Sequence, residues 1–259
     1  MRFRPLFCLV LLLSGCASAQ SAGDGAANDP FEPVNRAIFT FNTQADKYVM
    51  RPVVKGYRFV TTQPVRDGVA NFFDNTTEPM NMANQALQGR FKSAGKTVLR
   101  FVVNTVAGFF GTHDVAAKMG LYGESTYFGD TLGVWGVPAG PYLILPLLGP
   151  SDVRDLTGLG ANYFLDPLTY ISWRNSRKDL RYYFWGHAGL KALVSYDKST
   201  DLLDDIMNNS LDPYAAMRSM YQQYRAQTVA RLSGKPSAQS EDGSGKASFE
   251  FSLDELDDE

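Results

Sequence analysis

Apolar residues recur at spacings of three and four along several stretches of the chain, which is the pattern of amphipathic helices. The first such stretch follows Asp29-Pro30 and Pro33, residues that suit the start of a helix. Its apolar positions are Val34, Ile38, Phe41, Ala45 and Tyr48. The spacing predicts a helix over this stretch.

Two glycines mark the ends of two further predicted helices. One helix is predicted over about residues 79–88 and ends before Gly89, which suits the position just after a helix. The other is predicted over residues 92–107, is strongly apolar in its second half, and is closed by Gly108. No segment sustains the strict alternation of a strand, so the sequence predicts an all-α fold.

A fourth helix is predicted to begin at Asp212-Pro213, an N-cap followed by proline in the first helical position. Its apolar stripe is predicted to pack in the core rather than to bind a ligand. The stripe consists of Tyr214, Met217, Tyr221 and Tyr224.

Residues 131–151 form a run of 21 residues without a charge. The length suits a membrane span, but four prolines and four glycines lie inside it, and a helix exposed to lipid cannot leave so many backbone groups unpaired. We interpret the run as bent apolar structure inside a membrane-embedded body or lining its cavity; a buried loop of a soluble domain is the alternative. Asp152, Arg154 and Asp155 follow directly. An apolar wall beside a polar edge suits an amphipathic ligand.

The N-terminus carries the signature of a secreted lipoprotein. Residues 1–15 combine two arginines, an apolar stretch and small residues, as in a signal peptide. Leu13-Ser14-Gly15-Cys16 matches the bacterial lipobox, which predicts lipidation of Cys16. An ordinary signal peptide with an incidental cysteine is the alternative. Ala17 rather than aspartate follows the anchor, which favours the outer membrane.

The composition divides the mature chain into three parts. Residues 16–28 are small and polar and are predicted to form a lipidated flexible tether. Residues 29–232 are predicted to form the helical domain. Residues 233–259 contain two lysines against eight acidic residues, which predicts a disordered acidic tail.

Several kinds of chemistry are excluded by the residues present. The formal net charge of −2 argues against a nucleic-acid binder. Two histidines and two cysteines give no metal site or disulfide framework, and Gly95-Lys96-Thr97 lacks the upstream glycine of a P-loop. The sequence therefore predicts a protein that is not an enzyme and holds no cofactor.

Six segments, taken together, resemble the MlaA/VacJ family of outer-membrane lipoproteins and follow the family order over nearly the whole body. They are DPFEPVNRAIFTFN (29–42), RPVVKGYR (51–58), NFFDNTTEPMNMANQALQG (71–89), RFVVNTVAGFFGTHDVA (100–116), FGDTLGVWGVPAGPYLILPLLGPSDVRD (128–155) and SLDPYAAMRSMYQQYR (210–225). Thr112-His113 is polar where a relative has apolar residues. This difference puts in doubt only a functional role of His113, not the resemblance.

The resemblance implies a ring-shaped, all-helical lipoprotein embedded in the inner, periplasmic leaflet of the outer membrane, with a central amphipathic channel. Family members remove mislocalised phospholipids from the outer leaflet and so maintain lipid asymmetry. The resemblance also implies a trimeric porin as partner, and a soluble periplasmic carrier that takes the lipid for return to the inner membrane.

Within this interpretation the sequence names three groups of candidate site residues. The candidate apolar wall of the channel consists of Val137, Tyr142, Leu143, Ile144, Leu145, Leu147 and Leu148. The candidate polar path consists of Asp152, Arg154 and Asp155. The N-terminal family motif consists of Asp29, Pro30, Asn35, Arg36, Phe39 and Asn42, for which helix packing and capping are the alternative role.

Two other functions remain open from the sequence. The chain could be a structural lipoprotein that scaffolds porins or other envelope proteins without transporting lipid. A lipid hydrolase using His113 is the other alternative.

Overall fold

The computed structural model describes residues 29–165 and 178–234. The predictions for Cys16, the signal peptide and the tether, and nearly all of the predicted tail, lie outside these residues. The described elements, in chain order, are α1 (Glu32–Ala45), the π-helical turn η1 (Asp46–Met50), α2 (Arg51–Val60), α3 (Gln63–Leu87), α4 (Phe91–Val106), α5 (Val115–Lys118), α6 (Phe128–Val134), β1 (Tyr142–Leu145), β2 (Gly149–Asp152), α7 (Val153–Leu165), α9 (Lys178–Asn209) and α10 (Pro213–Leu232).

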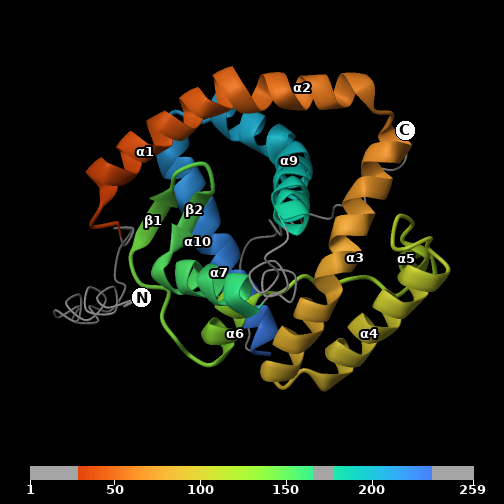
Figure 1. Cartoon of the computed structure of the whole chain (residues 1–259). Coiled ribbons are helices and arrows are strands. Elements are labelled where there is room, and N and C mark those ends of the chain that lie inside the picture. The colour runs from red at the N-terminus through yellow and green to blue at the C-terminus, as the bar shows by residue number, and fades with distance from the viewer. Residues whose placement is uncertain (1–28, 166–177, 235–259) are drawn as a thin grey trace, which may run out of the picture.

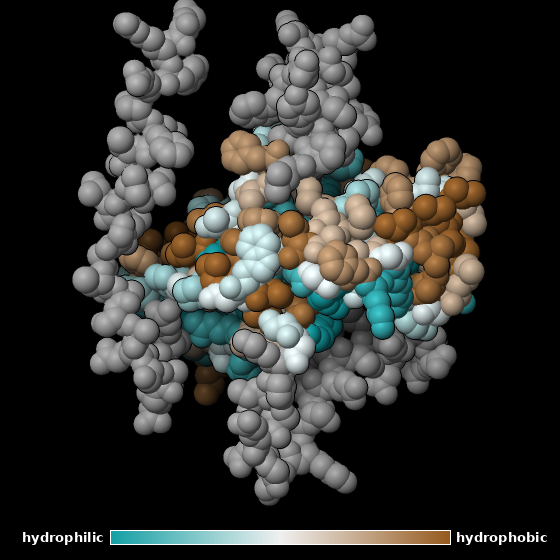
Figure 2. All heavy atoms as spheres, turned by 90° about the horizontal axis from the view of Figure 1, so that it is seen from below, coloured by the Kyte–Doolittle hydropathy of each residue, from teal (hydrophilic) through white to brown (hydrophobic). Residues whose placement is uncertain are grey.

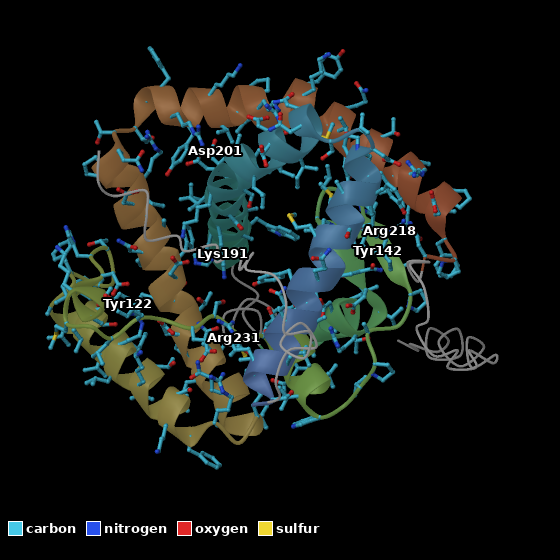
Figure 3. All side chains as sticks on the ribbon, turned by 180° about the vertical axis from the view of Figure 1, so that it is seen from behind. Tyr122, Tyr142, Lys191, Asp201, Arg218 and Arg231 are labelled. Atoms are coloured by element: carbon cyan, nitrogen blue, oxygen red, sulfur yellow. The ribbon has the colours of Figure 1, made fainter. Side chains whose placement is uncertain are left out.

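The helices are arranged as a ring (Figure 1). α1, η1 and α2 form one edge, α3 and α4 form the next, and α6, α7, the two strands and α10 complete the circuit. α9 runs through the inside of the ring and packs against α3 and α10. Figure 3 shows Lys191 of α9 inside the ring and Tyr122 at its outer side. The predicted helical ring is confirmed.

The predicted helix boundaries agree with the structure except at one start. α3 ends just before Gly89, which has a φ of 76°, and α4 spans Phe91–Val106 as expected. The predicted start at Pro79 is wrong, because α3 begins at Gln63 and contains Pro79 in its interior. Proline suits the first turn of a helix, and inside a helix it removes one backbone hydrogen bond. A long, well-packed helix such as α3 tolerates the loss of that bond. 

The uncharged run contains an antiparallel hairpin that the sequence did not predict. Tyr142 pairs with Asp152, and Leu145 pairs with Gly149. The strands of four residues are too short for their alternation to be recognised in a stretch rich in proline. The interpretation of the run as bent apolar structure agrees with the hairpin and with α6, which begins at Phe128, just before the run.

Two small apolar clusters join elements that are distant in the sequence. Ala70 and Phe73 of α3 pack against Val194 of α9, and Tyr142 and Ile144 of β1 pack against Tyr214 of α10. The predicted stripe on α10 is confirmed for Tyr214 and Met217, which are buried. It is wrong for Tyr224, which is largely exposed.

Many large apolar side chains lie on the surface instead of in these clusters. Figure 2, seen from below, shows a dense apolar patch on the side where α4 and α5 lie in Figure 1. Exposed residues of α4 include Phe91, Val98, Leu99, Val102 and Val106. Among the described residues, no helix combines the length and the apolar character that a membrane span requires.

Candidate functional site

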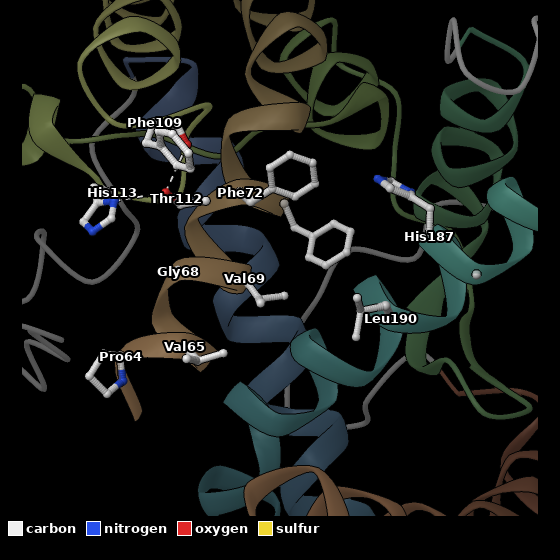
Figure 4. Close-up of a pocket in the computed structure, with 12 residues that line it drawn as sticks. Pro64, Val65, Gly68, Val69, Phe72, Phe109, Thr112, His113, His187 and Leu190 are labelled. Carbon is white, nitrogen blue, oxygen red and sulfur yellow. Dashed lines mark hydrogen bonds between the residues drawn. The ribbon is translucent and has the colours of Figure 1, made fainter. Parts of the chain in front are cut away.

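An apolar cavity of about 690 Å³ lies between α3 and α9 (Figure 4). α3 contributes its N-terminal half, α9 contributes one face, and the loop between α4 and α5 contributes the third side. The lining residues are Pro64, Val65, Gly68, Val69, Phe72, Phe73, Phe109, Thr112, His113, Gly186, His187 and Leu190. The volume and the apolar lining are typical of a site that binds a small apolar or amphipathic molecule.

Both histidines of the chain line this cavity. The Nδ1 atom of His113 lies 3.0 Å from the hydroxyl oxygen of Thr112, and the ring of His187 contacts the ring of Phe73 edge-on at 5.0 Å. The cavity therefore combines an extended apolar surface with a few polar groups. That combination suits a molecule with an acyl chain and a polar head.

Asp114 does not serve as an orienting carboxylate for His113. It accepts hydrogen bonds from Arg100 at 2.9 Å and Asn104 at 2.9 Å, and it caps α5 at the backbone N–H of Ala117. Burial raises the pKa of Asp114, but these hydrogen bonds outweigh burial and lower it below its ordinary value. Asp114 is thus a structural carboxylate that joins α4 to α5.

The residues of the candidate apolar wall lie in the hairpin and in the segment just before it, but their side chains lie on different faces. Tyr142 and Ile144 are buried against α1 and α10, and Leu143 and Leu145 are half-buried. Val137 precedes the hairpin and is partly exposed, whereas Leu147 and Leu148 at its turn are largely exposed. None of the seven lines the cavity between α3 and α9. A role of this hairpin as a channel wall stays a prediction.

The residues of the candidate polar path are buried in a network of charges. Asp152 accepts from the backbone N–H of Asp155 at 2.7 Å, and Arg154 lies within 3.4 Å of both carboxylates. Arg225 of α10 donates to Asp155 at 2.8 Å and to Asp130 of α6 at 2.6 Å. These ion pairs join α6, α7, the hairpin and α10, and a role of the three residues in a lipid path stays a prediction.

The two neighbouring aspartates have opposite pKa shifts. Burial raises the pKa of Asp155, but hydrogen bonds from Arg225 and Tyr221 outweigh burial and lower it. Burial dominates at Asp152 and raises its pKa. Sequence reasoning missed Arg225 and Asp130, because no local pattern links residues 95 positions apart.

Two asparagines of the N-terminal motif bind the hairpin through its backbone. Asn35 donates to the carbonyl oxygen of Tyr142 at 3.0 Å and accepts from the N–H of Ile144 at 2.9 Å. Asn42 donates to the carbonyl oxygen of Leu145 at 2.9 Å and accepts from the N–H of Leu147 at 2.8 Å. Each side-chain amide therefore pairs with the hairpin as a backbone amide of a neighbouring strand would.

The other motif residues join the start of the helical domain to α10. Asp29 accepts from Arg218 at 3.0 Å and from the hydroxyl of Tyr214, and Arg36 donates to Asp212 at 2.7 Å. The ring of Phe39 contacts the ring of Tyr214 edge-on at 5.8 Å. Pro30 lies in the turn before α1. These contacts agree with the packing and capping role that the sequence left open.

Comparison with known proteins identifies relatives over most of the chain. The family model described as "MlaA lipoprotein" matches residues 27–228. The intermembrane phospholipid transport system lipoprotein MlaA of Escherichia coli is 34% identical over 227 residues, which cover 85% of this chain and 86% of that protein. An uncharacterized protein of Rickettsia prowazekii is 35% identical over 208 residues, which cover 78% of each chain.

A solved structure has the same fold. It is described as the structural basis for maintenance of bacterial outer membrane lipid asymmetry, and it superposes with a TM-score of 0.65 at 32% sequence identity. The match covers 78% of this chain and 98% of the solved chain.

Proposed function

Because the chain belongs to the MlaA lipoprotein family, we propose that it transports phospholipids out of the outer membrane and thereby maintains the lipid asymmetry of that membrane. The observation that carries the proposal is the match over 85% of the chain to a lipoprotein of E. coli named for intermembrane phospholipid transport. The family is one of transport lipoproteins, which agrees with the prediction that the chain is not an enzyme.

The same proposal includes the direction and the mechanism of phospholipid transport. Mislocalised phospholipid enters from the outer leaflet, passes through a central amphipathic channel of the ring, and leaves toward the periplasm. A charged headgroup in hydrocarbon carries a large desolvation cost, which a path with one polar and one apolar side reduces. Movement of misplaced lipid out of the outer leaflet is downhill, so the proposed transport requires no nucleotide site.

The apolar cavity supports this function, because it lies beside α9 inside the ring and is large enough for part of an acyl chain. The exposed apolar residues of α4 and of the neighbouring loop support immersion of the outer face of the ring in one leaflet. Lipidation at Cys16 would hold the chain at the periplasmic leaflet of the outer membrane. A trimeric porin and a soluble periplasmic carrier complete the proposed pathway.

The test measures phospholipid in the outer leaflet of cells that lack the protein, using a membrane-impermeant amine reagent. We expect outer-leaflet aminophospholipid to rise on deletion and to return to its normal level with the wild-type chain. Leu190→Asp places a charge in the cavity and should restore less than about a fifth of the clearance at matched membrane levels.

Leu202→Asp is the matched control, because Leu202 lies on the same helix with nearly the same exposed fraction, 43% against 40% for Leu190, and does not line the cavity. It should restore clearance fully. Unchanged outer-leaflet phospholipid after deletion would favour the scaffold function instead.

A further inference from the structure

The cavity, called the groove below, has lining residues on both sides of α3 (Figure 4). The loop with Phe109 and His113 lies on one side of α3, and α9 with Leu190 lies on the other side. In the ring, α9 lies inside and the loop between α4 and α5 lies on the outer side (Figure 1). The lining residues of the groove therefore extend from the outer side of the ring toward its interior.

A glycine lies where the groove crosses the helix. Gly68 is inside α3, where glycine lowers helix stability relative to other residues. The nearest atom to a Cβ built there is the carbonyl oxygen of Thr112 at 3.5 Å, an ordinary contact distance. A small side chain would therefore fit, and a large one would extend into the space between α3 and the loop.

The outer end of the groove is formed by a strained aromatic turn. Phe109 and Phe110 have φ angles of 52° and 58°, which bulky residues seldom adopt. Backbone hydrogen bonds from Phe110 to Thr105 at 3.0 Å and from Gly111 to Asn104 at 2.8 Å hold the turn. The turn keeps Phe109 in the lining of the groove and 72% exposed, next to the exposed Phe110 and Val106.

We propose that this groove is a lateral path along which one acyl chain of a phospholipid passes between the bilayer-facing edge of the ring and its interior. Phe109 forms the outer entrance, and Gly68 keeps the crossing of α3 open. The groove suits an acyl chain because its lining is almost entirely apolar and is continuous with the exposed apolar turn. The inference rests on the proposed function and adds the route that the lipid takes.

The first experiment compares Gly68→Leu with Gly56→Leu in the full-length lipidated protein. Gly56 is also helical, on α2, but a Cβ there has no atom within 4 Å and the residue lies outside the groove. The proteins are reconstituted in vesicles of phosphatidylethanolamine and phosphatidylglycerol that contain a phospholipid with a photoreactive acyl chain, and labelled peptides are mapped by mass spectrometry.

We expect wild type and Gly56→Leu to be labelled in residues 64–73, 107–113 and 186–190, the three segments that line the groove. Gly68→Leu should lower that labelling at least fivefold. Both variants should unfold at or above the wild-type temperature, because leucine is a better helix former than glycine. A loss of labelling together with retained stability separates a blocked path from a misfolded protein.

The second experiment replaces Phe109 by asparagine, a residue that tolerates the left-handed conformation. Phe109→Asn should lower labelling of residues 186–190 severalfold without lowering the unfolding temperature, whereas a residue with only a packing role would destabilise the protein when replaced. Phe91→Asn is the control, because Phe91 is 74% exposed, lies at the helical start of α4 and is outside the groove. It should leave the labelling unchanged.

Equal labelling of the Gly68→Leu and Gly56→Leu variants would overturn the lateral path. Labelling elsewhere in the protein, with none in residues 64–73 or 107–113, would also overturn it while leaving the proposed function intact. If no phospholipid labels the wild-type protein and deletion leaves the outer leaflet unchanged, the proposed function itself fails.

Discussion

At the scale of single residues, buried ion pairs of α10 are central to the structure. Arg225 contacts carboxylates of α6 and α7, and its own side chain is almost fully buried. A buried charge is costly unless it is paired, so each member of such a network depends on the others. These residues therefore determine stability whether or not they face a lipid.

Arg225→Met tests this dependence. The substitution removes the guanidinium that lies 2.6 Å from both Asp130 and Asp155, and Asp155 keeps only the more distant Arg154. We expect the free energy of unfolding to fall by about 3–5 kcal/mol. Arg58→Met is the control, because the pair of Arg58 with Asp197 is partly exposed and should contribute at most about 1 kcal/mol. The measurement is denaturant unfolding in detergent, and equal losses for both variants would contradict the prediction.

The opposite pKa shifts of Asp155 and Asp152 predict different responses to pH. Asp155 has a lowered pKa in the folded protein, so its contribution to stability is complete above about pH 4–5 and is lost as the pH falls through the folded value. Asp155→Asn should therefore destabilise the protein at pH 7 and reduce the loss of unfolding temperature below pH 4.

Asp152→Asn should behave differently from its neighbour. The raised pKa of Asp152 means that the charged carboxylate is disfavoured in the folded protein. The protonated carboxyl group therefore stabilises the fold at low pH, and this stabilisation is lost as the pH rises through the folded pKa of Asp152. An asparagine keeps the oxygen that accepts from the N–H of Asp155. We expect no loss of unfolding temperature at pH 7, and a loss as large as that of Asp155→Asn would refute the assignment.

At the scale of elements, the hairpin is bound by α1 as well as by the pairing of its own strands. β1 and β2 are short, and an isolated two-stranded hairpin is marginally stable at best. The side-chain amides of Asn35 and Asn42 bind four backbone groups of the hairpin segment. α1 thereby takes the place of a third strand.

Asn35→Ala and Asn42→Ala should loosen different parts of the hairpin. Removal of Asn35 should increase hydrogen exchange at the amide of Ile144, and removal of Asn42 should increase it at the amide of Leu147, because each amide loses its acceptor. Thr40→Ala is the control on the same helix, since the hydroxyl of Thr40 donates to the carbonyl oxygen of Arg36 within α1. If hydrogen exchange at the amides of Ile144 and Leu147 is the same in all three variants, the pairing of the strands alone holds the hairpin.

At the scale of the whole molecule, the ring places apolar side chains outward as well as inward. The exposed aromatic and aliphatic residues of α4 and the neighbouring turn exceed what an aqueous surface favours. This distribution is one of the observations behind the proposal that the ring lies in one leaflet.

Trp135 offers a probe of this placement. It is 54% exposed at the end of α6, and its indole N–H donates to the carbonyl oxygen of Leu87 at 3.0 Å. In a variant with Trp173 and Trp185 replaced by phenylalanine, we expect lipids brominated on the acyl chains to quench Trp135 emission by more than half. Quenching by aqueous acrylamide alone would place this edge of the ring outside the bilayer.

The sequence by itself determined the helical class, the ends of α3 and α4, the N-cap of α10 and the family. These features depend on local periodicity, on capping residues and on motifs of adjacent positions, which a sequence records directly. It failed at the start of α3 and at the hairpin, where a proline and two very short strands carry little local signal.

The tertiary structure alone decided which polar groups meet and where the cavity lies. Arg225 joins Asp130, Asn35 joins Tyr142, and the two histidines reach one groove, although each pair is separated by more than 70 residues in the chain. Buried charges and amides must find partners wherever the fold provides them. Those partnerships follow from the closure of the ring, because the contacts that satisfy a buried group are set by packing between distant elements and not by its neighbours in sequence.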